Sequence, residues 1–486
     1  MAVLRGDDQL AFAPALELAR LVGRGELRSS ELVELYLRRC EEIDGDLGAF
    51  VTVAAERAME QARAADARLG SAGLPPFHGI PIAIKDLNET AGIRTTHGSA
   101  LFGSHVPEAD DRTVARLKQA GFIVIGKTTT PELGFSFVSE PPASPPARNP
   151  WDPSRTPGGS SGGAAAAVAA GLAPIAQGSD AGGSIRLPAT RCGLFGLKPS
   201  RGRVSAAPHS DQLNWQNGPI TRTVADAAAM LDAMAGYEAG DAWSAPPPAR
   251  PFLTEVGAPP GRLRVAVSTG GAEDLYPGTR RALEAAAQTL AALGHEVDLA
   301  DPLPPWAVVP ARAAVAEGMG YTGVEISRYP GLPPVDDIDL GVLDPFVREC
   351  LERARAVTAL QYVARLEAMF IRARAFVALW ERFDVLLTPV VTGPALEIGA
   401  GRDGSPVDLF ILWWSNSPFL GTWNLTGQPA AAVPIGLDDL GLPVGVQLVG
   451  PPAGEALLLR LCAQFEAARP WAERRPPLVV ARPTGA

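Results

Sequence analysis

The sequence predicts a single large α/β protein, an α/β/α sandwich whose mixed, mostly parallel central sheet is covered by helices on both faces. Short apolar runs typical of buried strands alternate with longer segments in which apolar residues recur at helical spacing. No long polar or charged linker divides the 486 residues, and the second half returns to the same alternation as the first. We therefore expect one domain over residues 1–486.

The N-terminal part, residues 1–70, is expected to form a helical layer. Residues 9–41 show helical spacing of apolar side chains in two pieces, with Ser29 and Ser30 available to cap the second piece. Residues 51–69 are alanine-rich and predict a further helix. None of these segments carries obvious chemistry.

The next part, residues 75–235, begins with the apolar run Ile80–Ile84, which predicts a buried strand ending at Lys85. A helix over Asp111–Gln119 and a strand over Phe122–Ile125 follow. This order predicts a strand–helix–strand unit.

The second half is expected to supply a variable substrate mouth over 236–375 and strands that close the sheet over 376–480. Residues 300–358 are rich in proline and are expected to be largely irregular. The regular elements that we expect are strands at 263–268, 296–299 and 385–388, helices at 220–235, 279–293 and 360–382, and a strand pair within 427–450.

Composition excludes several classes of function. A formal net charge of −10 argues against a nucleic-acid groove, which needs a basic surface. The four cysteines are far apart and show no metal-ligand spacing, so we expect reduced, buried thiols in a cytoplasmic protein with no metal and no cofactor. The N-terminus lacks a secretory apolar region, and the longest weakly apolar run, 164–176, is too short to cross a bilayer.

The stretch Arg155–Ala189 stands out from the rest of the chain. Two glycine-serine clusters, Gly158–Gly163 and Gly178–Ser184, flank a run of small helix-forming residues, an order that a flexible linker would not keep. A phosphate-binding loop needs Lys-Ser or Lys-Thr after its second glycine, but Ala164 follows Gly163. The pattern instead favours a nucleophile on a tight turn.

In the second cluster, the backbone N–H groups of Ala181, Gly182, Gly183 and Ser184 can converge on one point, as an oxyanion hole requires. A serine nucleophile also needs a base, because its free hydroxyl is weakly nucleophilic. No histidine lies near in sequence, and the obvious basic group is Lys85.

These residues resemble the amidase signature family of serine hydrolases, most closely a stand-alone bacterial amidase or aryl acylamidase. Three separate segments carry the resemblance: Gly79–Asp86, Gly158–Gly163 and Asp180–Arg186. The segments FDVLLTP at 383–389 and 427–450 match as well, so the similarity covers most of the chain. It implies the amidase signature fold and hydrolysis of linear amide C–N bonds.

The resemblance also implies a Ser–cis-Ser–Lys triad, with Ser184 as nucleophile, Ser160 as proton relay and Lys85 as base. Ser160 and Lys85 precede Ser184 by 24 and 99 residues, and this spacing alone favours Ser160 over Ser161. Lys85 must be neutral to accept a proton, and burial would lower its pKa. We expect Asp86 to face the opposite side of the strand.

Asp180 and Arg186 flank the proposed nucleophile and are expected to hold the turn in shape. Large apolar side chains occur in two regions that the family uses around its pockets, and from these we expect Trp215 and Trp414 to bind substrate. Both regions are tryptophan-containing, and they read Asn214-Trp215-Gln216-Asn217 and Ile411-Leu412-Trp413-Trp414, with Phe419 and Trp423 beyond.

An apolar or aromatic amide is therefore the expected substrate, and an aryl carbamate is equally compatible. The expected partner is this small molecule alone, bound by a monomer or homodimer, without nucleic acid or membrane. Two alternatives stay open: the glutaminase subunit of a tRNA-dependent amidotransferase, and a non-catalytic member of the same fold. Leu187 stands where that subunit usually has glutamine.

Overall fold

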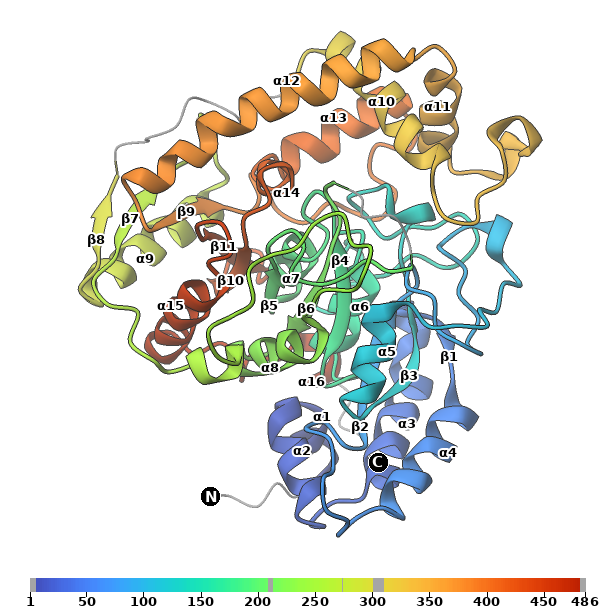
Figure 1. Ribbon diagram of the computed structural model, residues 1–486, viewed down its shortest axis with the longest axis vertical. Helices are drawn as coiled ribbons and strands as arrows, with labels where there is room; N and C mark the ends of the chain where they lie inside the picture. The colour runs from blue at the N-terminus through green and yellow to red at the C-terminus, as the bar shows by residue number, and fades with distance from the viewer. Residues whose placement is uncertain (1–5, 209–212, 273, 300–309, 481–486) are drawn as a thin grey trace.

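The computed structural model of the protein describes residues 6–208, 213–272, 274–299 and 310–480. Its centre is one sheet of eleven strands in the order β1-β3-β2-β4-β6-β5-β10-β11-β9-β7-β8, flanked by helices (Figure 1). The predicted α/β class with a mixed sheet is confirmed. The strands of both halves of the chain belong to this one sheet.

Parallel pairing is less common than we expected. Among the described strands, β2 pairs in parallel with β3 and β4, and β7 pairs in parallel with β8 and β9. The other six pairings are antiparallel. Part of the reason is the short connection between β10 (Ala430–Leu437) and β11 (Pro443–Val449), because a parallel crossover needs a dozen or more residues.

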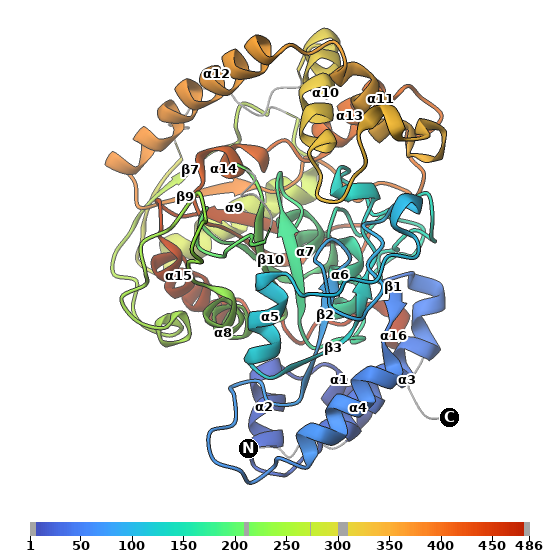
Figure 2. The same cartoon turned by 45° about the vertical axis from the view of Figure 1, so that its right-hand side comes forward.

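Helices α1 (Asp7–Ala11), α2 (Ala15–Gly23), α3 (Ser29–Leu47) and α4 (Ala55–Asp66) form the predicted N-terminal layer at one end of the molecule (Figures 1 and 2). Between α3 and α4 lies β1 (Phe50–Val53), which we expected to be helical. Within the described ranges, it is a short strand that pairs with β3 alone, at the end of the sheet. Four residues before an alanine-rich helix give too short a pattern to separate strand from helix.

The predicted strand–helix–strand unit is present as β2 (Ile80–Lys85), α5 (Arg112–Gln119) and β3 (Phe122–Thr128). Both strands are buried throughout, and Lys85 is the last residue of β2. Beside β2 lies β4 (Ala176–Asp180), whose last three residues are the first three of the second glycine-serine cluster.

Two helices surround the clusters. Helix α6 (Gly162–Ala169) is buried along its whole length and packs against β2, β3 and β4, because its glycine and alanine side chains permit a close approach. Helix α7 (Arg186–Cys192) starts two residues after Ser184 and packs against β5, β10 and β11.

Most of the remaining elements are strands of this sheet or helices that pack near it. They are β5 (Phe195–Lys198), β6 (Gln216–Thr221), α8 (Val224–Met234), β7 (Arg264–Val267), α9 (Pro277–Ala292), β8 (Glu296–Asp298), β9 (Val385–Pro389), α14 (Gly421–Thr426), α15 (Glu455–Ala468) and α16 (Pro477–Val480). The expected helices at 220–235 and 279–293 and the expected strands are found with bounds shifted by a few residues.

We expected an irregular segment over 300–358. Residues 300–309 lie outside the described residues, and for 310–358 the expectation is wrong. Helices α10 (Arg312–Ser327) and α11 (Pro345–Ala354) form there. Pro345 opens α11 at a position where proline is well tolerated, and the Asp344 carboxylate caps the helix by accepting from the N–H of Phe346.

With α12 (Ala359–Val377) and α13 (Pro406–Asn416), these two helices gather at the end of the molecule opposite the N-terminal layer (Figures 1 and 2). Apolar side chains of α10, α11 and α13 form a second core there, separate from the core around the sheet. Across the described ranges, no helix is both long and apolar enough to cross a membrane. All four cysteines are buried and unpaired.

Candidate active site

The first glycine-serine cluster is packed so tightly that some of its glycines cannot be replaced. A Cβ on Gly159 would lie 2.8 Å from the backbone nitrogen of Val138, and one on Gly163 would lie 2.5 Å from the carbonyl oxygen of Ala49. The Gly159–Ser160 peptide bond is cis. The close backbone contacts of these glycines place Ser160 beside the end of β2.

Lys85 meets Ser160 at this point. Its Nζ donates to Ser160 Oγ at 2.7 Å and to the carbonyl oxygen of Ser179 at 3.3 Å. The lysine is fully buried. Burial lowers the pKa of Lys85 well below its ordinary value of 10.5, although the charge of Asp180 opposes the shift.

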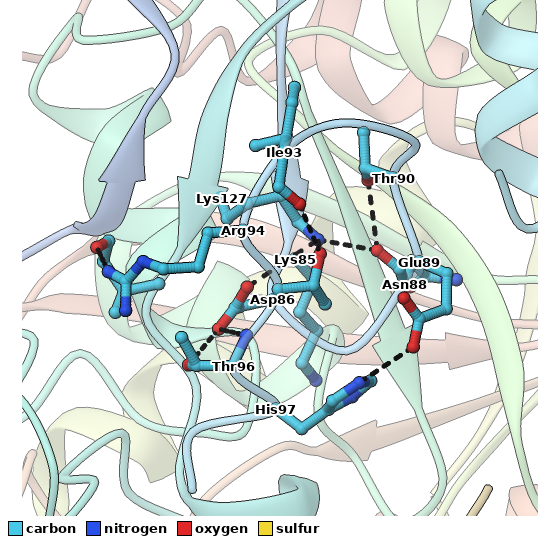
Figure 3. Close-up of polar contacts among 12 residues, drawn as sticks. Lys85, Asp86, Asn88, Glu89, Thr90, Ile93, Arg94, Thr96, His97 and Lys127 are labelled. Carbon is cyan, nitrogen blue, oxygen red and sulfur yellow. Dashed lines mark hydrogen bonds and ion pairs between the residues drawn. The ribbon is translucent and has the colours of Figure 1, made fainter. Parts of the chain in front are cut away.

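Asp86 points away from Lys85, as strand alternation predicts (Figure 3). Its Oδ2 accepts from the backbone N–H and the hydroxyl of Thr96, at 3.0 and 2.5 Å. Its Oδ1 lies 3.7 Å from Nζ of the buried Lys127. Asp86 therefore forms an ion pair with Lys127 and not with its sequence neighbour Lys85.

Ser160 and Ser161 have different contacts in the structure. In the sequence, only the spacing to Ser184 distinguished the two residues. Ser161 Oγ donates to the carbonyl oxygen of Ser179 at 3.2 Å, and its backbone N–H donates to the carbonyl oxygen of Ser184 at 3.2 Å. Ser161 therefore ties the two glycine-serine clusters together, while Ser160 contacts Lys85.

Ser184 sits on a turn held by the buried ion pair of Asp180 and Arg186. The Asp180 carboxylate accepts from the N–H of Gly183 at 2.7 Å, the N–H of Ile185 at 3.1 Å and Nη2 of Arg186 at 2.8 Å. Burial alone would raise the pKa of Asp180, but the Arg186 guanidinium holds it well below its usual range. These contacts match the scaffold role expected for both residues.

The predicted oxyanion donors are not equally placed. Ala181, Gly182 and Ser184 line one cavity together. Gly183 is buried and directs its N–H at Asp180. It has a φ of 125°, and a Cβ there would lie 2.3 Å from a methyl carbon of Leu420, so only glycine fits the turn.

This cavity has a volume of about 500 Å³ and a largely aromatic wall. Trp215 lines it, as predicted, but Trp414 is not among its described lining residues. Trp413 takes that place, since successive residues of a helix point about 100° apart. The ring of Trp414 stacks on that of Phe410, with the two ring centroids 6.2 Å apart. The other aromatic residues of the wall are Phe135, Phe137, Trp243, Tyr321, Phe346, Tyr362, Phe370 and Phe410.

Two further aromatic residues named from the sequence, Phe419 and Trp423, are fully buried and belong to separate apolar clusters. They contribute to packing and do not line the cavity among the described residues.

Two polar residues that the sequence did not single out also position the site. Ser139 Oγ donates to the carbonyl oxygen of Gly158 at 3.1 Å and accepts from the N–H of Gly162 at 3.0 Å, so it clamps the cluster around Ser160. The side-chain oxygen of Gln177 accepts from the backbone N–H of Lys85 at 3.1 Å. Neither belongs to a motif that sequence reasoning could have used.

The fold and this group of residues together define a hydrolytic enzyme. The family model for amidases matches residues 31–459, and the chain belongs to this family. The chain is therefore an amidase, an enzyme that hydrolyses amide C–N bonds, and the resemblance seen in the sequence is confirmed.

Individual relatives cover nearly the whole chain. Putative amidase AmiB2 of Mycobacterium tuberculosis is 42% identical over 490 residues, which span 96% of this chain and 98% of the relative. The solved structure of 6-aminohexanoate cyclic dimer hydrolase superposes with a TM-score of 0.86 at 33% identity, covering 96% of this chain and 99% of the other. One glutamyl-tRNA(Gln) amidotransferase subunit, from Thermus thermophilus, is 37% identical over 96% of this chain and 99% of its own.

Proposed function

We propose that this amidase hydrolyses apolar or aryl amides, or aryl carbamates, through a covalent acyl-Ser184 intermediate, acting on its own as a monomer or homodimer. The observation that carries the proposal is the position of Ser184. It lies with Ala181 and Gly182 on the wall of the largely aromatic cavity, and its carbonyl oxygen accepts from the N–H of Ser161, the residue after the Ser160 that contacts Lys85.

In the first step, Ser184 Oγ attacks the substrate carbonyl while its proton passes to Ser160 and from Ser160 to Lys85. A neutral lysine is needed, and the lowered pKa of Lys85 supports this state. Neutral Nζ keeps two hydrogens and one lone pair. It can donate to the carbonyl oxygen of Ser179 while it accepts the proton of Ser160.

The tetrahedral oxyanion needs donors that are already in place when charge develops. The N–H groups of Ala181 and Gly182 are suited to this role because both residues line the cavity beside Ser184. Gly183 contributes by holding the turn, since its N–H donates to Asp180. Ser160 then protonates the leaving nitrogen, and water repeats the cycle on the acyl-enzyme.

The cavity wall supports an apolar or aryl substrate. Leu133, Leu213, Leu366 and Met369 add to its aromatic surface, and its charged members are Glu325, Arg328 and Arg365. Burying an apolar group against such a wall is favourable by about 25 cal/mol per Å². A carbamate presents the same carbonyl carbon to Ser184, so the geometry admits it equally.

The similarity to the amidotransferase subunit from Thermus thermophilus means that the experiment must also test the glutaminase alternative. Against it, Leu187 is buried in α7 in an apolar cluster with Val390, Val391 and Leu420. At this position glutamine would place an amide among these side chains, where it would need hydrogen-bond partners.

A substrate panel on the purified single chain tests the proposal. It contains p-nitroacetanilide, a longer acyl anilide, an aryl carbamate, the 6-aminohexanoate cyclic dimer and glutamine, with Ser184→Ala as the matched control. We expect cleavage of an anilide or carbamate, no glutaminase activity, and no turnover by the control. Glutaminase activity, or silence until the other components of an amidotransferase are added, would replace the proposal with the alternative.

A further inference from the structure

The loop between β2 and α5 brings two histidines and a glutamate into contact outside the cavity. His97 Nε2 lies 3.0 Å from Glu89 Oε1, and His105 Nε2 lies 3.1 Å from both carboxylate oxygens. One ligand atom from each residue lies within 4.8 Å of the other two. Figure 3 shows His97 directed at Glu89.

These separations are close to those of a first-row metal site. Zinc binds imidazole nitrogen and carboxylate oxygen at about 2.0–2.2 Å, so tetrahedral ligand atoms lie roughly 3.3 Å apart. Separations of 3.0 and 3.1 Å need to widen by only a few tenths of an ångström to accept an ion. Two imidazoles and one carboxylate also form a donor set typical of divalent transition metals.

His97 is held in place from its other side. Its Nδ1 lies 2.9 Å from the hydroxyl of Tyr329, which follows α10. A metal-binding imidazole commonly uses its second nitrogen for such a bond, which fixes the ring and its tautomer. The backbone of His97 has a φ of 51°, a region that non-glycine residues seldom adopt. Its N–H is bound by Asp86 and its carbonyl by Leu133.

The surroundings suit a cation with access to solvent. His97 is buried, while His105 has a side-chain exposure of 40% and Glu89 of 20%, so an ion could enter past His105 and keep a water ligand.

We propose that Glu89, His97 and His105 form a binding site for one divalent transition-metal ion, best suited to Zn²⁺, which stabilises the loop that follows Lys85. This departs from the metal-free protein expected from the sequence, where the three residues are spaced eight apart and fit no familiar motif. The site lies outside the catalytic cavity among the described residues, so the proposal does not depend on the proposed substrate.

The competing explanation is a cluster of hydrogen bonds with no ion. Both Nε2–H groups can donate to Glu89 while His97 Nδ1 accepts from Tyr329, so these contacts are satisfied without metal. The two explanations differ in what the substitutions do to Zn²⁺ affinity.

The test uses tag-free, full-length protein stripped with EDTA and titrated with Zn²⁺ by calorimetry, with Co²⁺ absorption as a probe of ligand geometry. His105→Ala and Glu89→Gln remove one ligand each. Glu108→Gln is the control, an exposed carboxylate in the same loop. Circular dichroism and the melting temperature of each variant check that it folds, with and without Zn²⁺.

We expect wild type and Glu108→Gln to bind one Zn²⁺ per chain and to melt at higher temperature with it. Substitution of a residue that only orients a metal ligand weakens metal binding about 10–100-fold. Loss of a ligand itself should therefore weaken Zn²⁺ binding by at least about tenfold. Absence of stoichiometric binding to wild type would overturn the proposal. Equal binding by folded His105→Ala or Glu89→Gln would overturn it as well.

Discussion

The buried pair of Asp180 and Arg186 holds the turn that carries Ser184, and Arg186→Met is expected to destabilise the whole protein. Both side chains are fully buried, with Arg186 Nε 2.9 Å from Asp180 Oδ2 and Nη2 2.8 Å from Oδ1. The guanidinium also donates to the carbonyl oxygen of Leu420 and to the side chains of Asn424 and Gln447. Methionine fills similar volume but supplies no donor.

Removing one partner of a buried ion pair costs about 3–5 kcal/mol, because the other charge stays buried without compensation. The loss should reach at least the upper end of that range, since three further acceptors lose a donor at about 1 kcal/mol or more each. Replacing the carboxylate as well, in Asp180→Asn/Arg186→Met, removes the uncompensated charge. We expect the double variant to lose less stability than the two single variants added together.

The dependence on pH has a definite sign. The folded-state pKa of Asp180 is depressed, so its ionised form contributes stability that is present above the unfolded value near 3.8 and is lost as pH falls toward the folded value. Without Arg186, burial raises the pKa of Asp180 instead. Protonation of Asp180 then favours the folded state of the variant, so the stability lost in Arg186→Met should be largest at neutral pH and should shrink as pH falls.

Urea unfolding followed by tryptophan fluorescence measures the free energy of unfolding at neutral pH and at a series of lower pH values. Arg264→Met serves as control, because the Arg264–Asp384 pair is partly exposed and such pairs contribute about 0–1 kcal/mol. A loss below about 1 kcal/mol in Arg186→Met at neutral pH, or a loss that does not shrink as pH falls, would refute the reasoning.

The other substitutions address the chemistry directly. Lys85→Met should lower kcat/KM by about 10²–10⁴-fold with unchanged circular dichroism, as loss of a general base does. In wild type, kcat/KM should rise with pH as Lys85 loses its proton, and a variant that keeps this rise would exclude lysine as the base. Ser139→Ala should lower both kcat and stability, the latter by about 1–3 kcal/mol, because buried partners of its hydroxyl lose their bonds. Its urea midpoint and kcat, measured on one preparation, check this, and an unchanged kcat would contradict the positioning role. Trp215→Leu should raise KM for an aryl anilide about tenfold with little change in KM for a small aliphatic amide. Equal effects on both substrates would place Trp215 outside the aryl contact.

Features set by local pattern were predictable from the sequence. The apolar run Ile80–Ile84 predicted a buried strand with Lys85 at its end, and the structure confirms it. The glycine-serine clusters identified the family because their small residues meet contacts that a Cβ would block.

Features set by tertiary contacts were not predictable. Strand β4 reads AQGSD, a polar sequence that is buried because Gln177 and Asp180 find partners on other elements. The choice between Trp413 and Trp414 depends on which face of α13 meets the cavity. The helices within 310–358 were hidden by prolines that open helices or lie between them.

The central claim is that Ser184 becomes covalently attached to substrate. Mass spectrometry after reaction with a fluorophosphonate measures this most directly, by locating the adduct on peptides of wild type and of Ser184→Ala. We predict one adduct per chain, on the peptide containing Ser184, and none on the folded Ser184→Ala variant. An adduct on another residue, or equal labelling of the variant, would contradict the account.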